Sequence, residues 1–273
     1  MASLPFAPLA EPARTTPARR SGWTGRIPAP GALVPPLILL GLWQSLCLTG
    51  LFPPQVLVPP SAVARTLVDM TASGELQRHV SDSLWRLGIG FGIGAAAGLA
   101  FGALIALSRL AEALFSPLFL ILWQVPVIAF VPVMVLFLGI DEPFKIAVVA
   151  IAGFFPVALA TFDGVRGVPK AWFEVARVYR TRLPDLIWRI LVPATVPAVL
   201  TGLRIALTRA WIVLVAAELL AADSGIGQMM EMGRQLFQID VVLAGVVVSG
   251  VIGFLLDRGA RLIERRASRW RSA

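Results

Sequence analysis

Few side chains in this sequence could carry out covalent or metal chemistry. There is one cysteine, Cys47, and one histidine, His79, which excludes a disulfide framework, a Cys/His zinc site and a relay that needs two imidazoles. No Ser-His-Asp set is apparent, and nothing matches the GxxxxGK[ST] pattern of a phosphate-binding loop. We therefore expect no catalytic residue, no metal and no cofactor bound by this chain.

The more informative polar residues interrupt an apolar run at 198–222. At 100° per residue, five of them fall, together with the apolar Val215, within an arc of about 100° on one helical face: Thr201, Arg204, Thr208, Trp211 and Glu218. A charge in mid-membrane costs at least about 2.5 kcal/mol, so this stripe should face protein or water.

We predict that this stripe contributes to a pathway for a solute. The candidate lining residues are Arg204, Thr208 and Glu218, together with Gln124 from an earlier apolar run, and Arg209 is a further basic candidate. Two alternatives stay open. The arginines could extend to the cytoplasmic boundary, and Glu218 could hydrogen-bond a neighbouring helix.

The elements that position these residues are predicted to be membrane helices. Hydrophobic residues make up 57% of the chain and charged residues 15%, against about 45–50% and 25% in soluble domains, and the mean hydropathy is +0.80. Six apolar runs are long enough to span a bilayer or nearly so: 32–50, 84–107, 114–138, 144–162, 198–222 and 241–256. The predicted fold class is an all-α membrane protein with six transmembrane helices.

The basic residues predict the orientation. Most of the 24 Lys and Arg residues fall on the side that holds both termini, so both termini are expected in the cytoplasm. The net charge of +8 then reflects cytoplasmic loops rather than nucleic-acid binding.

Four regions follow from this topology. Residues 1–31 form a disordered cytoplasmic tail, and 32–79 hold the first span and an external amphipathic helix with Ser61 as its N-cap. Residues 80–257 form the transmembrane domain, which includes a cytoplasmic loop at 163–197, and 258–273 form a basic cytoplasmic tail.

Small residues predict how the helices pack. Glycines recur every four residues in the second span, at Gly90, Gly94, Gly98 and Gly102, a spacing that allows close backbone approach. Prolines within the third and fourth spans, Pro126, Pro132 and Pro156, predict kinks.

The cytoplasmic loop 163–197 is expected to form two short helices, the second beginning at Pro184 and ending before Pro193. Its surface is too apolar to stay free in water, since it carries Trp172, Phe173, Ile187, Trp188 and Ile190. We expect it to insert into a partner.

This loop resembles the EAA loop of permease subunits in type I ABC importers, whose usual form is E-A-A-x3-G-x9-I-x-L-P. The matching positions begin at Glu174-x-Ala176 and end at Ile190-x-x-Pro193, whereas Arg180 stands where glycine is usual. Val175 and Val192 also depart from the pattern. The stretches 197–207, 217–218 and 223–227 are similar to the aliphatic sulfonate, taurine and nitrate branch.

The resemblance implies a type I importer permease fold in the bacterial cytoplasmic (inner) membrane. Its expected partners are a second copy of the chain, two ATPase subunits that bind ATP and Mg, an external solute-binding protein and the lipid bilayer. The coupling residues carried over from the motif are Glu174, Ala176, Arg177, Arg180, Ile190 and Pro193. A local alternative is that Glu174 only pairs with Arg177 along its own helix.

The resemblance further implies a translocation pathway for small organic anions, with aliphatic sulfonates as the expected solute. Taurine, nitrate or bicarbonate, or another small solute are alternatives. A different class, an ATP-independent secondary transporter or channel, would need several relay groups. Glu218 has no histidine or second acidic residue within a predicted span, which disfavours that class.

Overall fold

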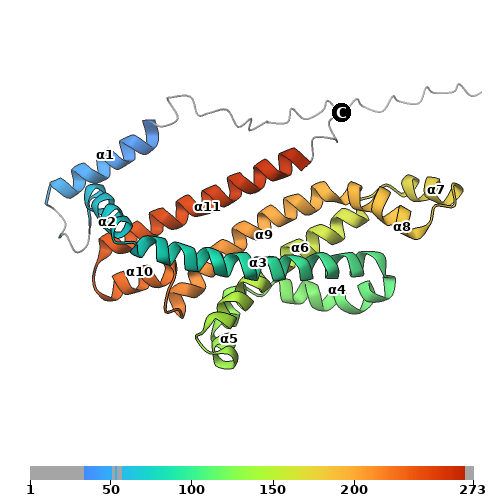
Figure 1. The fold of residues 1–273 in the computed structure, drawn as a ribbon, viewed down its shortest axis with the longest axis horizontal. Coiled ribbons are helices and arrows are strands. Elements are labelled where there is room, and N and C mark those ends of the chain that lie inside the picture. The colour runs from blue at the N-terminus through green and yellow to red at the C-terminus, as the bar shows by residue number, and fades with distance from the viewer. Residues whose placement is uncertain (1–33, 51–52, 54–56, 268–273) are drawn as a thin grey trace, which may run out of the picture. The chain divides into compact units, whose positions relative to one another are not determined.

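The structure is a computed structural model that describes residues 34–50, 53 and 57–267, and every regular element in this part of the chain is helical (Figure 1). The all-α prediction is therefore confirmed. The helices are α1 (Val34–Leu48), α2 (Pro60–Ala72), α3 (Glu75–Leu107), α4 (Arg109–Trp123), η2 (Val127–Phe130), α5 (Val131–Leu138), α6 (Glu142–Arg166), α7 (Lys170–Val178), α8 (Leu183–Leu186), η3 (Ile187–Leu191), α9 (Val192–Leu220), α10 (Ile226–Gln235) and α11 (Ile239–Ala267).

Four helices in the described residues are long and apolar enough to cross a membrane: α3, α6, the continuous stretch Pro184–Leu220, and α11. A fifth span exists if α4 and Val127–Leu138, which meet at 90°, count as one. The first predicted run gives α1, whose 15 residues fall short of a full span. The described residues thus do not reproduce six spans. The predicted tail at 1–31 lies outside them. Of the predicted tail at 258–273, residues 258–267 continue α11 and 268–273 lie outside the described residues.

The core is the pair α3 and α6, which pack along most of their lengths. The four glycines of α3 lie in this contact. A Cβ added at Gly90 or Gly98 would lie 2.7 Å from a main-chain carbonyl oxygen of α6, and Gly94 and Gly102 are closer still. Because a methyl group cannot fit at these distances, glycine at this spacing brings the two backbones together.

Only one of the three predicted proline kinks is present as a break. Pro126 lies in the turn between α4 and η2, where the bent pair changes direction. Pro132 instead occupies the first turn of α5, where a missing N–H costs no intrahelical bond. α6 continues through Pro156, which is buried beside Gly202 of α9.

The loop at 163–197, predicted to be cytoplasmic, differs from the prediction at its second helix. The helix that starts near Pro184 does not end before Pro193 but continues through a π-helical turn, Ile187–Leu191, into α9. In a π turn the hydrogen bonds join residues five apart. This local change lets the helix continue although Pro193 has no N–H to donate.

The amphipathic helix after the first apolar run also begins earlier than predicted. α2 starts at Pro60 with Pro59 at the N-cap position, so Ser61 lies inside the helix. Proline is favoured in a first turn because its fixed φ suits the helix. Val63 is buried against Ala244 of α11, so this helix is packed on protein along one face.

Candidate functional site

Four of the six motif residues of the predicted cytoplasmic loop lie in α7 or directly after it: Glu174, Ala176, Arg177 and Arg180. The helix closes with two hydrogen bonds: the Thr181 amide donates to the Ala176 carbonyl at 2.9 Å, and the Arg180 amide donates to the Arg177 carbonyl at 3.0 Å. This is a Schellman cap, in which the residue after the C-cap takes a left-handed conformation. Arg180 has φ +48°, in the left-handed region that glycine adopts most easily. This conformation accounts for the glycine that is usual at this position of the motif.

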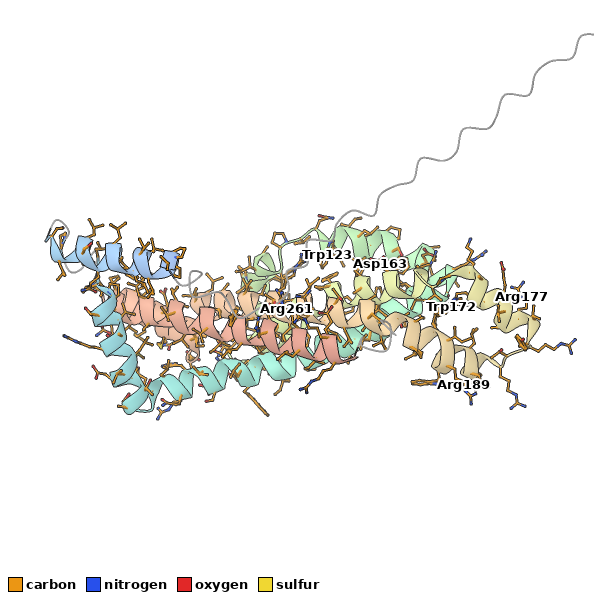
Figure 2. The ribbon with its side chains drawn as sticks, turned by 90° about the horizontal axis from the view of Figure 1, so that it is seen from above. Trp123, Asp163, Trp172, Arg177, Arg189 and Arg261 are labelled. Carbon is orange, nitrogen blue, oxygen red and sulfur yellow. The ribbon has the colours of Figure 1, made fainter. Side chains whose placement is uncertain are left out.

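The side chains of this loop form an exposed apolar surface. Trp172 is 48% exposed, Tyr179 80% and Trp188 71%, whereas Ala176 is buried. Figure 2 shows Trp172, Arg177 and Arg189 at this end of the molecule. Ile190 lies in the π turn and Pro193 in the first turn of α9.

Glu174 is exposed. Across the described part of the chain it makes no ion pair, with Arg177 or with any other residue. The local-pair alternative is therefore not realised, and the Glu174 carboxylate is available to a partner.

The polar stripe on α9 packs largely against α11 rather than lining an open space. Arg204 lies 3.4 Å from Asp257 and 3.0 Å from Glu264, both on α11. Trp211 Nε1 donates to the Ser249 carbonyl at 3.1 Å, and Thr208 donates to a carbonyl of its own helix. The placement of Arg204 and Thr208 does not favour the pathway role predicted for them.

Glu218 lies in a buried ion-pair network. Its carboxylate is 2.8 Å from Nη1 of Arg86 and accepts hydrogen bonds from Ser83 Oγ at 2.8 Å and from the Gly227 amide at 3.1 Å. Glu218 is 1% exposed and Arg86 2%. This geometry favours the structural alternative for Glu218.

The same network ties α3 to α6 and to the turn before α10. Arg86 Nη2 lies 2.6 Å from Glu142 Oε1, at the start of α6, and also donates to Ser224 Oγ. Sequence reasoning missed Arg86, which lies near the start of the predicted span 84–107. The signal was its spacing, since Arg86 and Ser83 lie four and seven positions before Gly90, on the face that packs.

Gly225 is required where this network meets the backbone. It has φ +108°, and an added Cβ would overlap the Glu218 carboxylate. Only glycine adopts that conformation easily and leaves the carboxylate its space.

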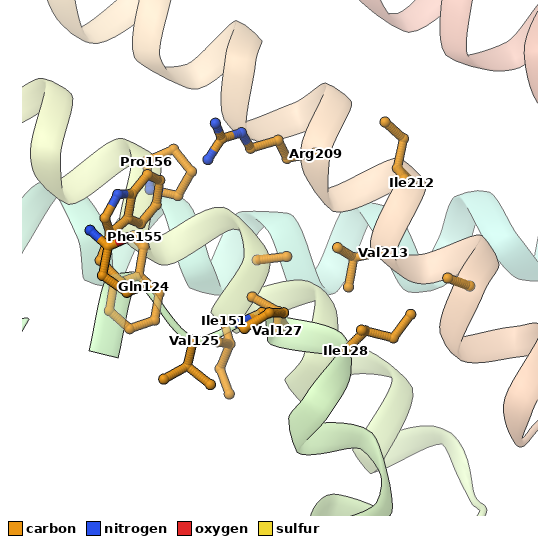
Figure 3. A pocket seen from close by; sticks show the side chains of 14 residues that line it. Gln124, Val125, Val127, Ile128, Ile151, Phe155, Pro156, Arg209, Ile212 and Val213 are labelled. Carbon is orange, nitrogen blue, oxygen red and sulfur yellow. The ribbon is translucent and has the colours of Figure 1, made fainter. Parts of the chain in front are cut away.

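An open cavity lies instead beside the break between α4 and η2. It has a volume of about 410 Å³, and its lining includes Gln124, Phe155 and Arg209. Figure 3 shows the Arg209 side chain extending from α9 toward Pro156, Phe155 and Gln124. Of the four predicted pathway residues, only Gln124 lines this cavity, and Arg209 joins it.

A second cavity of about 450 Å³ shares Trp123, Pro156 and Arg209 with the first and extends to Asp163. The Arg209 guanidinium lies over the Trp123 ring, 5.1 Å from its centroid. Sequence reasoning missed Trp123, which carries no spacing signal. Among the described residues, no group of three His, Cys, Asp or Glu side chains could hold a metal ion.

The sequence matches a known family and several named relatives. Residues 88–269 match the family described as binding-protein-dependent transport system inner membrane component. The protein named as the aliphatic sulfonates transport permease SsuC of Bacillus subtilis (strain 168) is 37% identical over 97% of this chain and 94% of its own length. SsuC of Escherichia coli (strain K12) is 35% identical, over 87% of this chain and 90% of its own.

The taurine transport system permease TauC of the same Escherichia coli strain is 33% identical, over 85% of this chain and 86% of its own. Among solved structures, an inward-facing MetNI methionine ABC transporter matches with a TM-score of 0.60 at 18% identity, covering 71% of this chain and 96% of that one. At that identity the likeness supports the fold alone.

Proposed function

Because the chain belongs to the family of binding-protein-dependent transport system inner membrane components, we propose that it forms the membrane pathway through which small aliphatic sulfonates are imported. It is a multi-pass permease subunit of an ABC importer in the bacterial inner membrane. The observation that carries the choice of solute is the 37% identity to SsuC over nearly the whole chain. Taurine is the nearest alternative, since TauC is similar at 33%.

The proposed complex contains two copies of this chain, two ATPase subunits and an external solute-binding protein. ATP and Mg belong to the ATPase subunits, and this chain contributes no catalytic residue. The exposed surface of α7 around Trp172 and Tyr179 supports this arrangement, because so much apolar surface outside the spans needs a partner. Glu174 is exposed beside it, and its carboxylate suits a basic group on the ATPase.

Charge reversal at Glu174 tests the coupling part of the proposal. We expect Glu174→Lys to abolish most ATP-dependent uptake and to reduce copurification of the ATPase subunits, because the introduced ammonium repels the basic partner. Asp69→Lys on α2 is the matched control, since Asp69 is an exposed carboxylate outside the loop. Normal uptake with normal ATPase binding in Glu174→Lys would remove Glu174 from the contact.

The solute is tested with the complete complex in proteoliposomes. We expect ATP-dependent uptake of radiolabelled ethanesulfonate that requires the solute-binding protein, with weaker uptake of taurine and nitrate. Uptake of nitrate in preference to both sulfonates would overturn the proposed solute class.

An ATP-independent transporter finds no support in the charged groups. The structure does bring Glu142 near Glu218, which the sequence did not predict, but both carboxylates are held by Arg86. Arg204 is likewise held by acidic residues of α11. Ethanesulfonate flux into liposomes that contain this chain alone would revive that alternative.

A further inference from the structure

Arg209 is a charged residue in the middle of a membrane helix that pairs with no acidic group in the described part of the chain. It lies well inside α9, far from either end. The other two charged residues within the same helix are paired, Arg204 with α11 and Glu218 with Arg86. Among the described residues, the Arg209 guanidinium contacts the ring of Trp123, and the side chain is otherwise exposed in the single chain. Because a charge at this depth is costly, an unpaired arginine here points to a ligand.

The surroundings of Arg209 define what that ligand could be. It stands between the two cavities, of about 410 Å³ and 450 Å³, and lines both of them. The walls of the first cavity are mainly Val, Ile, Phe and Pro side chains, with Gln124 as a second polar group (Figure 3). No acidic residue lines that cavity, and the one acidic residue of the second is Asp163.

We propose that Arg209, assisted by Gln124, binds the oxyanion head group of the transported solute while the apolar walls receive its alkyl chain. This inference rests on the proposed function and names the site where the anion is held in transit. A guanidinium offers five N–H donors in a fork that matches several oxygens at once. The cation–π contact with Trp123 uses no N–H donor, so those donors remain available to an anion in the cavity.

The same lining discriminates between related sulfonates. An alkyl sulfonate gains from burying its chain against apolar walls. Taurine carries an ammonium on the terminal carbon of ethanesulfonate, and that ammonium finds no carboxylate in the first cavity. Because an unpaired buried charge is costly, the site favours ethanesulfonate over taurine.

Chemical protection of Arg209 gives a direct readout of binding. The complete detergent-solubilised complex is treated with phenylglyoxal, which modifies arginine, and the modified residues are quantified by mass spectrometry. We expect ethanesulfonate to slow modification of Arg209 severalfold, and the uncharged ethyl methyl sulfone to leave it unchanged. Arg258, an exposed arginine on α11, is the internal control and keeps its rate. Equal modification of Arg209 with and without ethanesulfonate would overturn the site.

Substitutions then test whether the site serves transport. We expect Arg209→Gln to lower ethanesulfonate uptake by about 10- to 100-fold, the range for a lost hydrogen bond to a charged group. Arg209→Lys retains the charge without the fork and should fall between Arg209→Gln and the wild type. Arg258→Gln is the matched control and should transport at the wild-type rate. Wild-type uptake by Arg209→Gln would overturn the role of this residue in transport.

The two readouts separate this inference from the proposed function. Protection of Arg209 without any ethanesulfonate uptake by the wild-type complex supports the site and refutes the proposed solute. Uptake by the wild type without protection of Arg209 supports the solute and refutes the site. If Arg209→Gln does not assemble with the ATPase subunits, protection in the wild type and uptake by Arg209→Lys decide the question.

Discussion

The buried pair Arg86–Glu218 is expected to be strongly coupled in a double-mutant cycle. Substituting Glu218 with methionine leaves the Arg86 guanidinium, 2% exposed, without one of its two carboxylates, and leaves Ser83 and the Gly227 amide without their acceptor. Removing one partner of a buried ion pair costs about 3–5 kcal/mol. Substituting Arg86 with methionine strands the Glu218 carboxylate and should cost a similar amount.

The double variant removes both charges together. If the two effects were additive, it would be destabilised by about 6–10 kcal/mol, twice the cost of a single broken pair. Because neither charge is then left buried alone, we expect the double variant to be no less stable than the worse single variant. The coupling free energy is then at least about 3 kcal/mol, at the upper end for residues in contact. Glu142 keeps Lys145 as a partner at 3.2 Å, so it adds little to the cost.

Equilibrium unfolding in mixed detergent micelles, followed by tryptophan fluorescence, measures the four free energies of the cycle. The exposed pair Arg189–Asp185, which lies at 3.1 Å four residues apart on the cytoplasmic loop, is the matched control, with an expected coupling of about 0.3–0.5 kcal/mol. Additive effects for Arg86 and Glu218 would refute the reasoning, because they would mean that the two groups do not depend on each other.

Three further results are expected. Arg180→Gly should stabilise the end of α7 by about 0.5–1 kcal/mol. A side chain in the left-handed region costs about 1–2 kcal/mol, and the greater conformational entropy that glycine loses on folding offsets part of the gain. Slower amide exchange in the loop measures the effect, and an equal effect of Arg180→Ala would assign it to charge instead. Gly94→Leu should destabilise the chain by more than about 3 kcal/mol through overlap with a carbonyl of α6, whereas Gly92→Leu, which meets nothing within 4 Å, should be tolerated in the same thermal unfolding assay. Hydrogen bonds from Arg234 lower the pKa of Glu231 from 4.5 to about 2. This carboxylate therefore contributes stability above pH 4.5 that is lost as the pH falls through 2. Glu231→Gln should remove that part of the loss of stability in an acid titration, and an unchanged decline below pH 4.5 would contradict the prediction.

The membrane helices could be predicted from the sequence because hydropathy and spacing are local properties. The run at 84–107 became α3, which extends it by polar turns at the N-terminal end, and the run at 144–162 became α6, which extends it at both ends. The glycine spacing in α3 likewise identified a face that packs, since residues four apart always share a face. The EAA-like pattern is also a local property of the sequence, and it located the exposed loop.

The neighbours of the polar residues on α9 could not be predicted, because they depend on which helix each face meets. The stripe on α9 is amphipathic, but its polar side packs on acidic residues of α11, more than fifty positions along the chain. Arg209 lies outside that stripe and lines the cavities. Helical periodicity gives the direction of a side chain and not the identity of its neighbour, so Trp123 and Arg86 both escaped prediction.

The glycine contact between α3 and α6 has a mechanical consequence. Where two backbones touch without intervening side chains, no rotamer change can absorb a small displacement, so the two helices must tilt together as one rigid body. α6 is separated from α7 only by the turn 167–169. A force applied to the exposed loop would therefore move α3 and α6 together, with little change in how the two helices pack.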